Sequence, residues 1–103
     1  MNDETISDEE LDRQYRAMID SFIDQANQQV QHNSPENVGM ALLFAASRFN
    51  AYVVSQHADS LHKYENDLDR ARAFFSQQYK EMLDENLEDY KSVYQKYHQF
   101  IKK

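Results

Sequence analysis

The sequence contains no cysteine and no tryptophan, and it has a single glycine, Gly39, and a single proline, Pro35. Without cysteine the chain cannot form disulfides, use a thiolate nucleophile or build a zinc site from thiolates. With one glycine, few positions suit the positive φ angles that tight hairpins and many catalytic loops require. These absences favour helices joined by very few turns.

Basic residues are also scarce, because 11 Lys and Arg stand against 18 Asp and Glu and give a formal net charge of −7. An acidic surface repels phosphate backbones, so the sequence predicts no nucleic-acid partner. Aromatic residues make up 13% of the 103 positions, more than a disordered acidic chain usually carries. We therefore expect one helical domain over residues 1–103, with a disordered start at residues 1–6.

The amino terminus has neither the basic start nor the apolar stretch of a signal peptide. A cytoplasmic location is the expectation that follows.

Three helix starts can be read from the sequence. Ser7 and Glu10 have the spacing of a capping box, which predicts a first helix over about 8–31. Ser34 can cap a second helix that begins at Pro35, over about 35–57. Asp59 or Ser60 can cap a third helix over about 60–101, where neither glycine nor proline follows. The predicted fold is all-α, a three-helix up-down bundle.

The third helix is unusually long for such a bundle. Its apolar residues keep one helical phase from Leu61 to Phe100, which predicts a rod of about 60 Å against about 35 Å for the other two. Either this helix is continuous and its end needs a partner, or it breaks near residues 84–87 into a fourth helix. The unbroken phase favours continuity. Asn86 lies on the apolar stripe, where a polar residue is commonly a register device or a bend.

The second helix is apolar at 13 of the 17 positions from Val38 to Val54. We expect one broad apolar face to pack within the chain. The opposite face carries small residues at its centre, which would let another helix approach closely. It comprises Met40, Leu43, Ser47, Ala51 and Val54. This pattern predicts a homodimer through the second helix; the alternative is that a kinked third helix of the same chain covers the face.

A membrane span is not predicted for this segment. Its 17 residues reach about 25 Å, short of the roughly 20 residues that a span requires. Arg48 near the centre would also cost about 2.5 kcal/mol or more to insert.

Chemistry-bearing residues are few. Arg48 could hold an anionic ligand with Asn50, Tyr52 and His57 nearby, or it could reach a carboxylate on a neighbouring helix. Metal ligation is not predicted, because Asp59-x-x-His62 occurs once and a di-iron bundle needs two Glu-x-x-His pairs. No nucleophile elbow or phosphate-binding loop is present. The sequence therefore predicts no enzyme, no cofactor and no metal.

Charge is distributed unevenly along the chain, since six of the first 12 residues are acidic and no acid follows Asp89. Tyrosines alternate with lysines after that point, a composition typical of protein interfaces. The predicted partner surface comprises Tyr90, Tyr94, Tyr97, Lys91 and Lys96. For Tyr90 and Tyr97, ordinary packing within the assembly remains the alternative.

Three segments resemble a family of small helical proteins from proteobacteria whose function is unknown. They are Phe22–Asn27 (FIDQAN), Ala45–Val54 (AASRFNAYVV) and Phe74–Tyr90 (FFSQQYKEMLDENLEDY). The resemblance implies an all-helical bacterial protein and carries no functional residue with it. The leading hypothesis is a non-enzymatic interaction module that acts as a homodimer; the alternative is a bundle that binds a small ligand or a metal.

Overall fold

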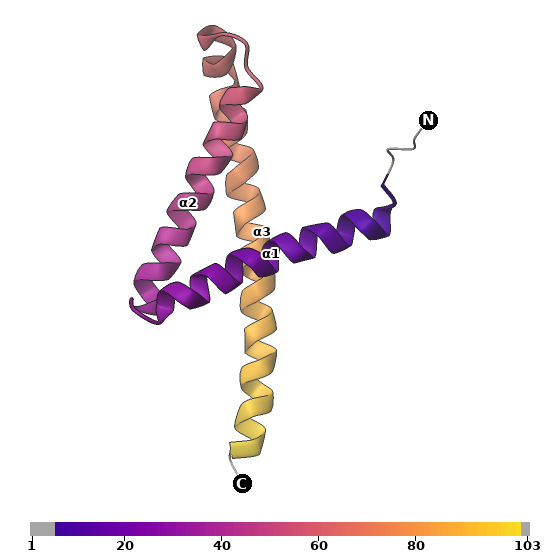
Figure 1. Ribbon diagram of the computed structural model, residues 1–103, viewed down its shortest axis with the longest axis vertical. Helices are drawn as coiled ribbons and strands as arrows, with labels where there is room; N and C mark the ends of the chain where they lie inside the picture. The colour runs from indigo at the N-terminus through magenta and orange to yellow at the C-terminus, as the bar shows by residue number, and fades with distance from the viewer. Residues whose placement is uncertain (1–5, 102–103) are drawn as a thin grey trace. The chain divides into compact units, whose positions relative to one another are not determined.

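The chain forms three α-helices and, within the residues that the structure describes, no strand (Figure 1). This computed structural model describes the backbone of residues 6–101 and the side chains of residues 6–96. The helices are α1 (Asp8–Val30), α2 (Pro35–Gln56) and α3 (Leu61–Ile101). The all-α class is confirmed, and each helix ends within one residue of its predicted bounds. The expected disordered start falls, apart from Ile6, outside the described residues.

A serine hydroxyl caps the start of each helix. Ser7 Oγ accepts from the amide of Glu10, and Ser34 Oγ accepts from the amide of Asn37, each at 3.1 Å. Ser60 Oγ accepts from the amide of Lys63 at 3.1 Å, so Ser60 and not Asp59 caps α3. Each cap satisfies one of the amide donors that the first helical turn leaves unpaired.

Only half of the predicted capping box at α1 is formed. The carboxylate of Glu10 accepts hydrogen bonds from the side chains of Arg13 and Gln14, one turn further along the helix. The Glu10 carboxylate therefore bonds to side chains on the surface of α1 and does not complete the capping box.

The third helix is continuous over its 41 residues, so the alternative of a break near residues 84–87 is wrong. At 1.5 Å per residue it spans about 60 Å. Asn86 does not end it, and the Nδ2 of this residue donates to the backbone oxygen of Met82 at 2.9 Å. The side chain of this stripe residue is thus bonded within its own helix.

The chain divides into two compact units, Met1–Tyr52 and Val53–Lys103. The first unit contains α1 and most of α2; the second contains the last turn of α2 and all of α3. Since α2 is a single helix from Pro35 to Gln56, the boundary falls inside a continuous element.

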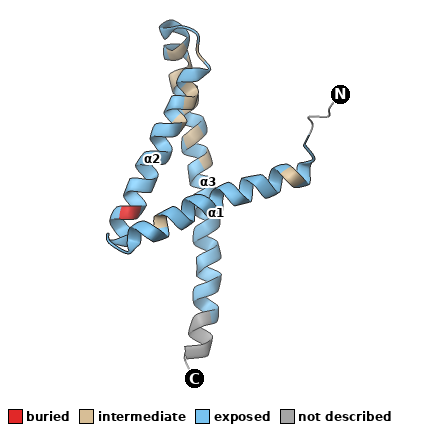
Figure 2. Cartoon of the chain, viewed as in Figure 1, coloured by how far each residue is buried: buried red, intermediate tan, exposed pale blue. Residues whose placement is uncertain are grey.

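Burial is slight across the described residues, among which Val38 alone is buried (Figure 2). In the second unit, half-buried residues lie at the end of α2 and along the first half of α3. They are Val53, Val54, Ala58, Tyr64, Asp67, Leu68, Ala71, Phe75 and Gln78. From Tyr79 to Lys96 every side chain is exposed. The described chain therefore leaves its apolar residues largely in contact with water.

Candidate interaction surfaces

The predicted dimer face of α2 is open to solvent over most of its length. Met40 is 65% exposed and Leu43 is 39% exposed. Ser47 and Ala51 are also exposed, and Val54 is half-buried. The Ser47 hydroxyl donates to the backbone oxygen of Phe44 at 2.8 Å, so this polar group is satisfied within the helix. A partner helix would meet apolar side chains and two small residues at this face.

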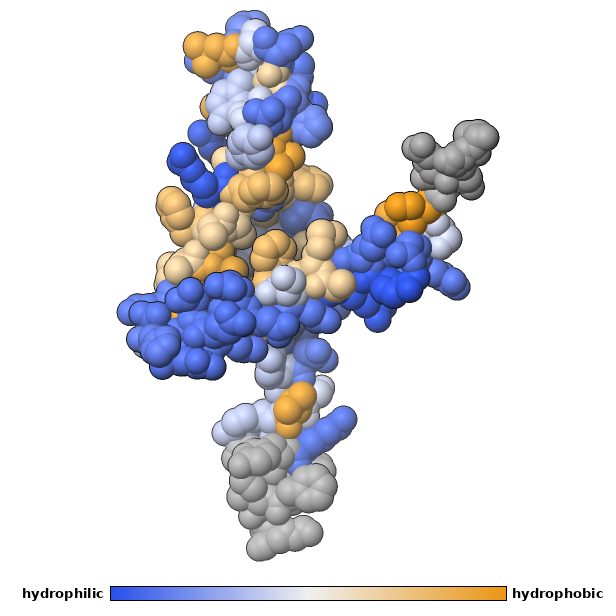
Figure 3. Space-filling model, viewed as in Figure 1, coloured by the Kyte–Doolittle hydropathy of each residue, from blue (hydrophilic) through white to orange (hydrophobic). Residues whose placement is uncertain are grey.

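The broad face of α2, which we expected to pack within the chain, is buried only at Val38. Phe49 is 64% exposed, and its ring lies 5.8 Å from that of Tyr52 on the next turn. Figure 3 shows apolar side chains gathered along α2 on the visible side of the molecule. Both faces of α2 therefore carry apolar surface that water contacts in the described structure.

By length and composition, α2 is the one helix among the described residues that is able to cross a membrane. It has 22 residues, which at 1.5 Å each give about 33 Å, so the length argument from 17 residues does not hold for the whole helix. The free-energy cost of inserting Arg48 into a bilayer still opposes a membrane span. Core helices of soluble proteins can have the same length and composition, so these two properties alone do not assign α2 to a membrane.

The four residues predicted to bind a ligand do not share one face of α2. Arg48 and Asn50 are two positions apart on a regular helix, so their side chains leave it about 160° apart. Tyr52 lies toward the Arg48 side, and His57 follows the last residue of α2. Among the described residues, Arg48 is exposed and forms no ion pair. Helix α2 alone does not assemble a pocket from these side chains.

No group of three or more His, Asp or Glu side chains that could hold a metal ion occurs within the part of the chain that the structure describes.

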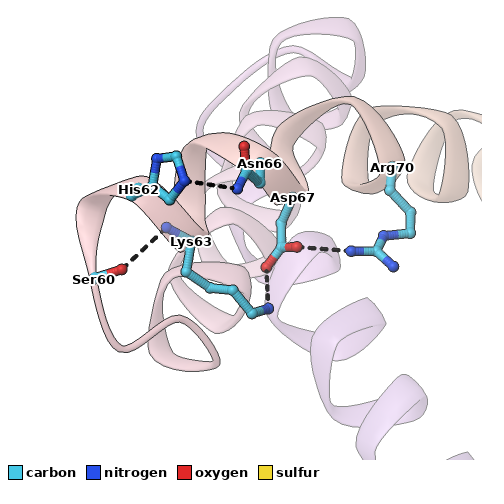
Figure 4. Close-up of polar contacts among 6 residues, drawn as sticks. All are labelled: Ser60, His62, Lys63, Asn66, Asp67 and Arg70. Atoms are coloured by element: carbon cyan, nitrogen blue, oxygen red, sulfur yellow. Dashed lines mark hydrogen bonds and ion pairs between the residues drawn. The ribbon is translucent and has the colours of Figure 1, made fainter.

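A cluster of polar side chains forms hydrogen bonds and ion pairs along the first turns of α3 (Figure 4). Asp67 Oδ2 accepts from Lys63 Nζ at 3.0 Å, and its Oδ1 accepts from Arg70 at 2.7 Å. Asn66 and the His62 ring lie 3.3 Å apart on the adjacent face. The side chain of Asp67 is 17% exposed, whereas that of Arg70 is 79% exposed.

The hydrogen bond from Lys63 lowers the pKa of the Asp67 carboxyl below the ordinary aspartate value. Partial desolvation opposes this shift, and the hydrogen bond from Arg70 adds to it. The cluster was missed at the sequence level, although spacings of four residues from Lys63 to Asp67 and three from Asp67 to Arg70 are those of helical ion pairs. Because both cations come from the same helix as the carboxylate, the cluster stabilises α3 and presents no open ligand site.

The predicted partner surface lies on the exposed second half of α3. Tyr90 is 73% exposed, and Tyr94 and Lys96 are exposed as well. Lys91 lies 3.9 Å from the carboxylate of Glu88, one turn earlier. The side chain of Tyr97 lies outside the described residues. The described tyrosines and lysines thus share one exposed stretch of helix, and their role as a partner surface stays a prediction.

Ion pairs in the described chain are all local. Each of the seven joins side chains three or four positions apart on one helix. Ion pairs of this kind on a helix surface contribute little to stability, because water and salt screen them. They support the individual helices and do not define a site.

Residues 15–91 match the family described as a protein of unknown function (DUF3144). The chain belongs to this family. The match runs from Tyr15 in α1 through α2 and along α3 to Lys91, so it contains both faces of α2 and confirms the resemblance seen in the sequence. No curated protein and no solved structure gives a significant match. Membership in DUF3144 therefore assigns the chain to a family but assigns no activity to it. The proteobacterial origin stays a prediction.

Proposed function

We propose that this DUF3144 protein is a non-enzymatic helical interaction module that acts as a homodimer, with α2 at the contact. The observation that carries the proposal is the exposure of Met40 and Leu43 on the most apolar helix of the chain. A helix that is apolar nearly all round is normally buried by more than one neighbour. A second copy supplies that neighbour through two-fold pairing, the commonest arrangement of protein oligomers.

The composition of the dimer face suits close packing of two helices. Helices approach to 8–10 Å depending on the side chains at the contact, and Ser47 and Ala51 lie between the larger residues of this face. Full burial of a Leu or Met side chain stabilises an assembly by about 1.5–3 kcal/mol. Met40 and Leu43, contributed by both copies, therefore supply four such side chains to one symmetric contact.

Insertion of α2 into a bilayer is the alternative to a dimer contact, because it would also remove the apolar surface of α2 from water. Arg48 would lie near the centre of the span, where its charge costs about 2.5 kcal/mol or more. The first turn of the helix carries Glu36, and the last turn has no basic residue, so α2 lacks the flanking cations common at cytoplasmic membrane boundaries. These charges favour a protein partner over lipid.

The test is the mass of the purified protein by light scattering. Wild type is expected at twice the mass of the 12.3 kDa chain. Leu43→Glu is expected at the mass of one chain, because a buried unpaired carboxylate in the contact is strongly unfavourable. Gln28→Glu adds the same charge to α1, opposite its apolar residues, and is expected to stay dimeric.

Three results would contradict the proposal. They are a wild-type monomer, a Leu43→Glu dimer that retains its helical circular dichroism, and wild type that sediments with neutral lipid vesicles. The last result would assign α2 to the membrane.

The alternative of a ligand-binding or metal-binding bundle receives no comparable support, because Arg48 and Asn50 point to different sides of α2. The bacterial and cytoplasmic setting expected from the sequence stays a prediction.

A further inference from the structure

The second half of α3 exposes an apolar stripe. Neither α1 nor α2 is long enough to cover both halves of α3. Helix α3 has 41 residues and α2 has 22, so α3 is longer by 19 residues, or about 28 Å. The large apolar residues of this half are 40–73% exposed. They are Tyr79, Met82, Leu83, Leu87, Tyr90, Val93 and Tyr94.

Helix α1 carries a stripe of matching length that is also exposed. Its large apolar residues begin at Leu11 and end at Val30, and all of them are at least 38% exposed. The α3 stripe covers the same number of helical turns when it is extended back from Tyr79 to the half-buried Phe75 and on to Tyr94. Aligned antiparallel, the two stripes place Leu11 opposite Tyr94 and Phe22 opposite Leu83. Large side chains then meet along the whole contact.

The charges at the ends of the two stripes have opposite signs. Asp8, Glu9 and Glu10 form the first turn of α1. After Asp89, the charged side chains of α3 within the described residues are Lys91 and Lys96. An antiparallel alignment brings these acids beside these lysines, and it also pairs the positive end of one helix dipole with the negative end of the other. A parallel alignment would place the acidic turn of α1 beside Arg72, which already pairs with Asp69, and would set like ends of the two helix dipoles together.

We propose that α1 of one copy lies antiparallel on the second half of α3 of a second copy. This inference rests on the proposed homodimer and names its second contact. Helices joined by turns as short as residues 31–34 and 57–60 run antiparallel to their sequence neighbours in a bundle. In the up-down bundle expected from the sequence, α1 and α3 of one chain would therefore run parallel. The antiparallel pairing that the charges favour therefore uses α1 of the partner copy.

The absence of cysteine allows a direct test in the full-length protein. Asp12 lies at the edge of the α1 stripe and Lys91 at the edge of the α3 stripe, about half a turn apart along the helix axis in the proposed alignment. Asp12→Cys and Lys91→Cys chains, one of them carrying a size tag, are mixed, unfolded, refolded together and oxidised gently. A mixed disulfide dimer is expected to form about tenfold faster than with Asp24→Cys, which lies on the opposite side of α1, because pairing raises the local thiol concentration.

A charge exchange provides an independent readout. Lys91→Glu and Asp12→Lys are each expected to weaken the dimer, and the double variant is expected to recover part of the lost affinity.

The outcomes separate this inference from the proposed function. A dimer by light scattering whose Asp12→Cys and Lys91→Cys chains cross-link no faster than the Asp24→Cys control overturns the α1–α3 contact alone. A monomer overturns both proposals. In a chain that carries both cysteines, an intrachain disulfide as the main product assigns α1 to its own α3 and also overturns the inference.

Discussion

The side-chain amide of Asn86 donates a hydrogen bond to the backbone oxygen of Met82, 2.9 Å away and one turn earlier in α3. Asn86 is flanked along the helix by Leu83 and Tyr90, both of which are exposed apolar residues. Its local bond satisfies one amide hydrogen without a partner helix. Asn86 is therefore a polar interruption of an apolar surface, and its replacement reports whether that surface is covered.

Asn86→Leu is expected to stabilise the protein more than Asn66→Leu does. Leu has the better helix propensity by about 0.4 kcal/mol at either position. Asn66 lies on the side of α3 opposite its half-buried residues, so only propensity and the contact with His62 change there. At residue 86 a covering partner would add about 1.5 kcal/mol or more from burial of the leucine. Urea unfolding of both variants at one protein concentration gives the difference. Equal effects would show that residue 86 stays in water.

Ser60→Ala is expected to destabilise the protein by about 1 kcal/mol, because the amide of Lys63 loses its capping acceptor. Ser60→Asp keeps an acceptor at the same position and is expected to retain most of the stability. Ser76→Ala, an exposed site within α3, is expected to be neutral or slightly stabilising through helix propensity. Thermal unfolding of the three variants makes the comparison. If Ser60→Ala matched Ser76→Ala, the cap would contribute nothing.

Asp67 makes the stability of the protein sensitive to acid. Hydrogen bonds from Lys63 and Arg70 lower the pKa of its carboxyl in the folded chain, so the unfolded chain takes up the proton first as the pH falls. The stabilisation is present above the unfolded value of about 3.9, and it is lost as the pH falls through that value and through the lowered pKa. Asp67→Asn is expected to flatten the dependence of unfolding free energy on pH in this range.

Asp69→Asn serves as the matched control, because the Asp69 side chain is 99% exposed beside Arg72. A titration of the carboxyl carbons by NMR checks the cause directly. Lys63→Met is expected to return the pKa of Asp67 toward the ordinary aspartate value. An unchanged pKa would show that Lys63 is not its main determinant.

Helix positions could be predicted from the sequence because their signals are local. Ser7, Ser34 and Pro35 fix the starts of the first two helices through bonds and φ restrictions within one turn. The unbroken phase from Leu61 likewise anticipated a continuous α3. The choice between Asp59 and Ser60 as cap remained open because both side chains carry a suitable acceptor.

Coverage of the helix faces could not be predicted in the same way. The broad face of α2 was expected to be packed within the chain, yet Phe49 and Tyr52 are exposed. Apolar periodicity identifies which side of a helix avoids water, but it does not identify whether the covering group belongs to the same chain. The predicted ligand residues do not share one face for a related reason. Arg48 and Asn50 are close in sequence, but side chains two positions apart on a helix point to different sides of it.

Among the residues that the structure describes, ion pairs form only within single helices, and this has a kinetic consequence. Contacts between residues three or four positions apart form as the helix itself forms, within about a microsecond. Sequences dominated by such contacts have low contact order and fold rapidly once their helices meet. In the proposed homodimer, by contrast, burial of α2 between two copies requires an encounter between chains. Refolding of this protein is therefore expected to show a fast phase independent of concentration, followed by a second-order phase whose rate rises with the amount of protein.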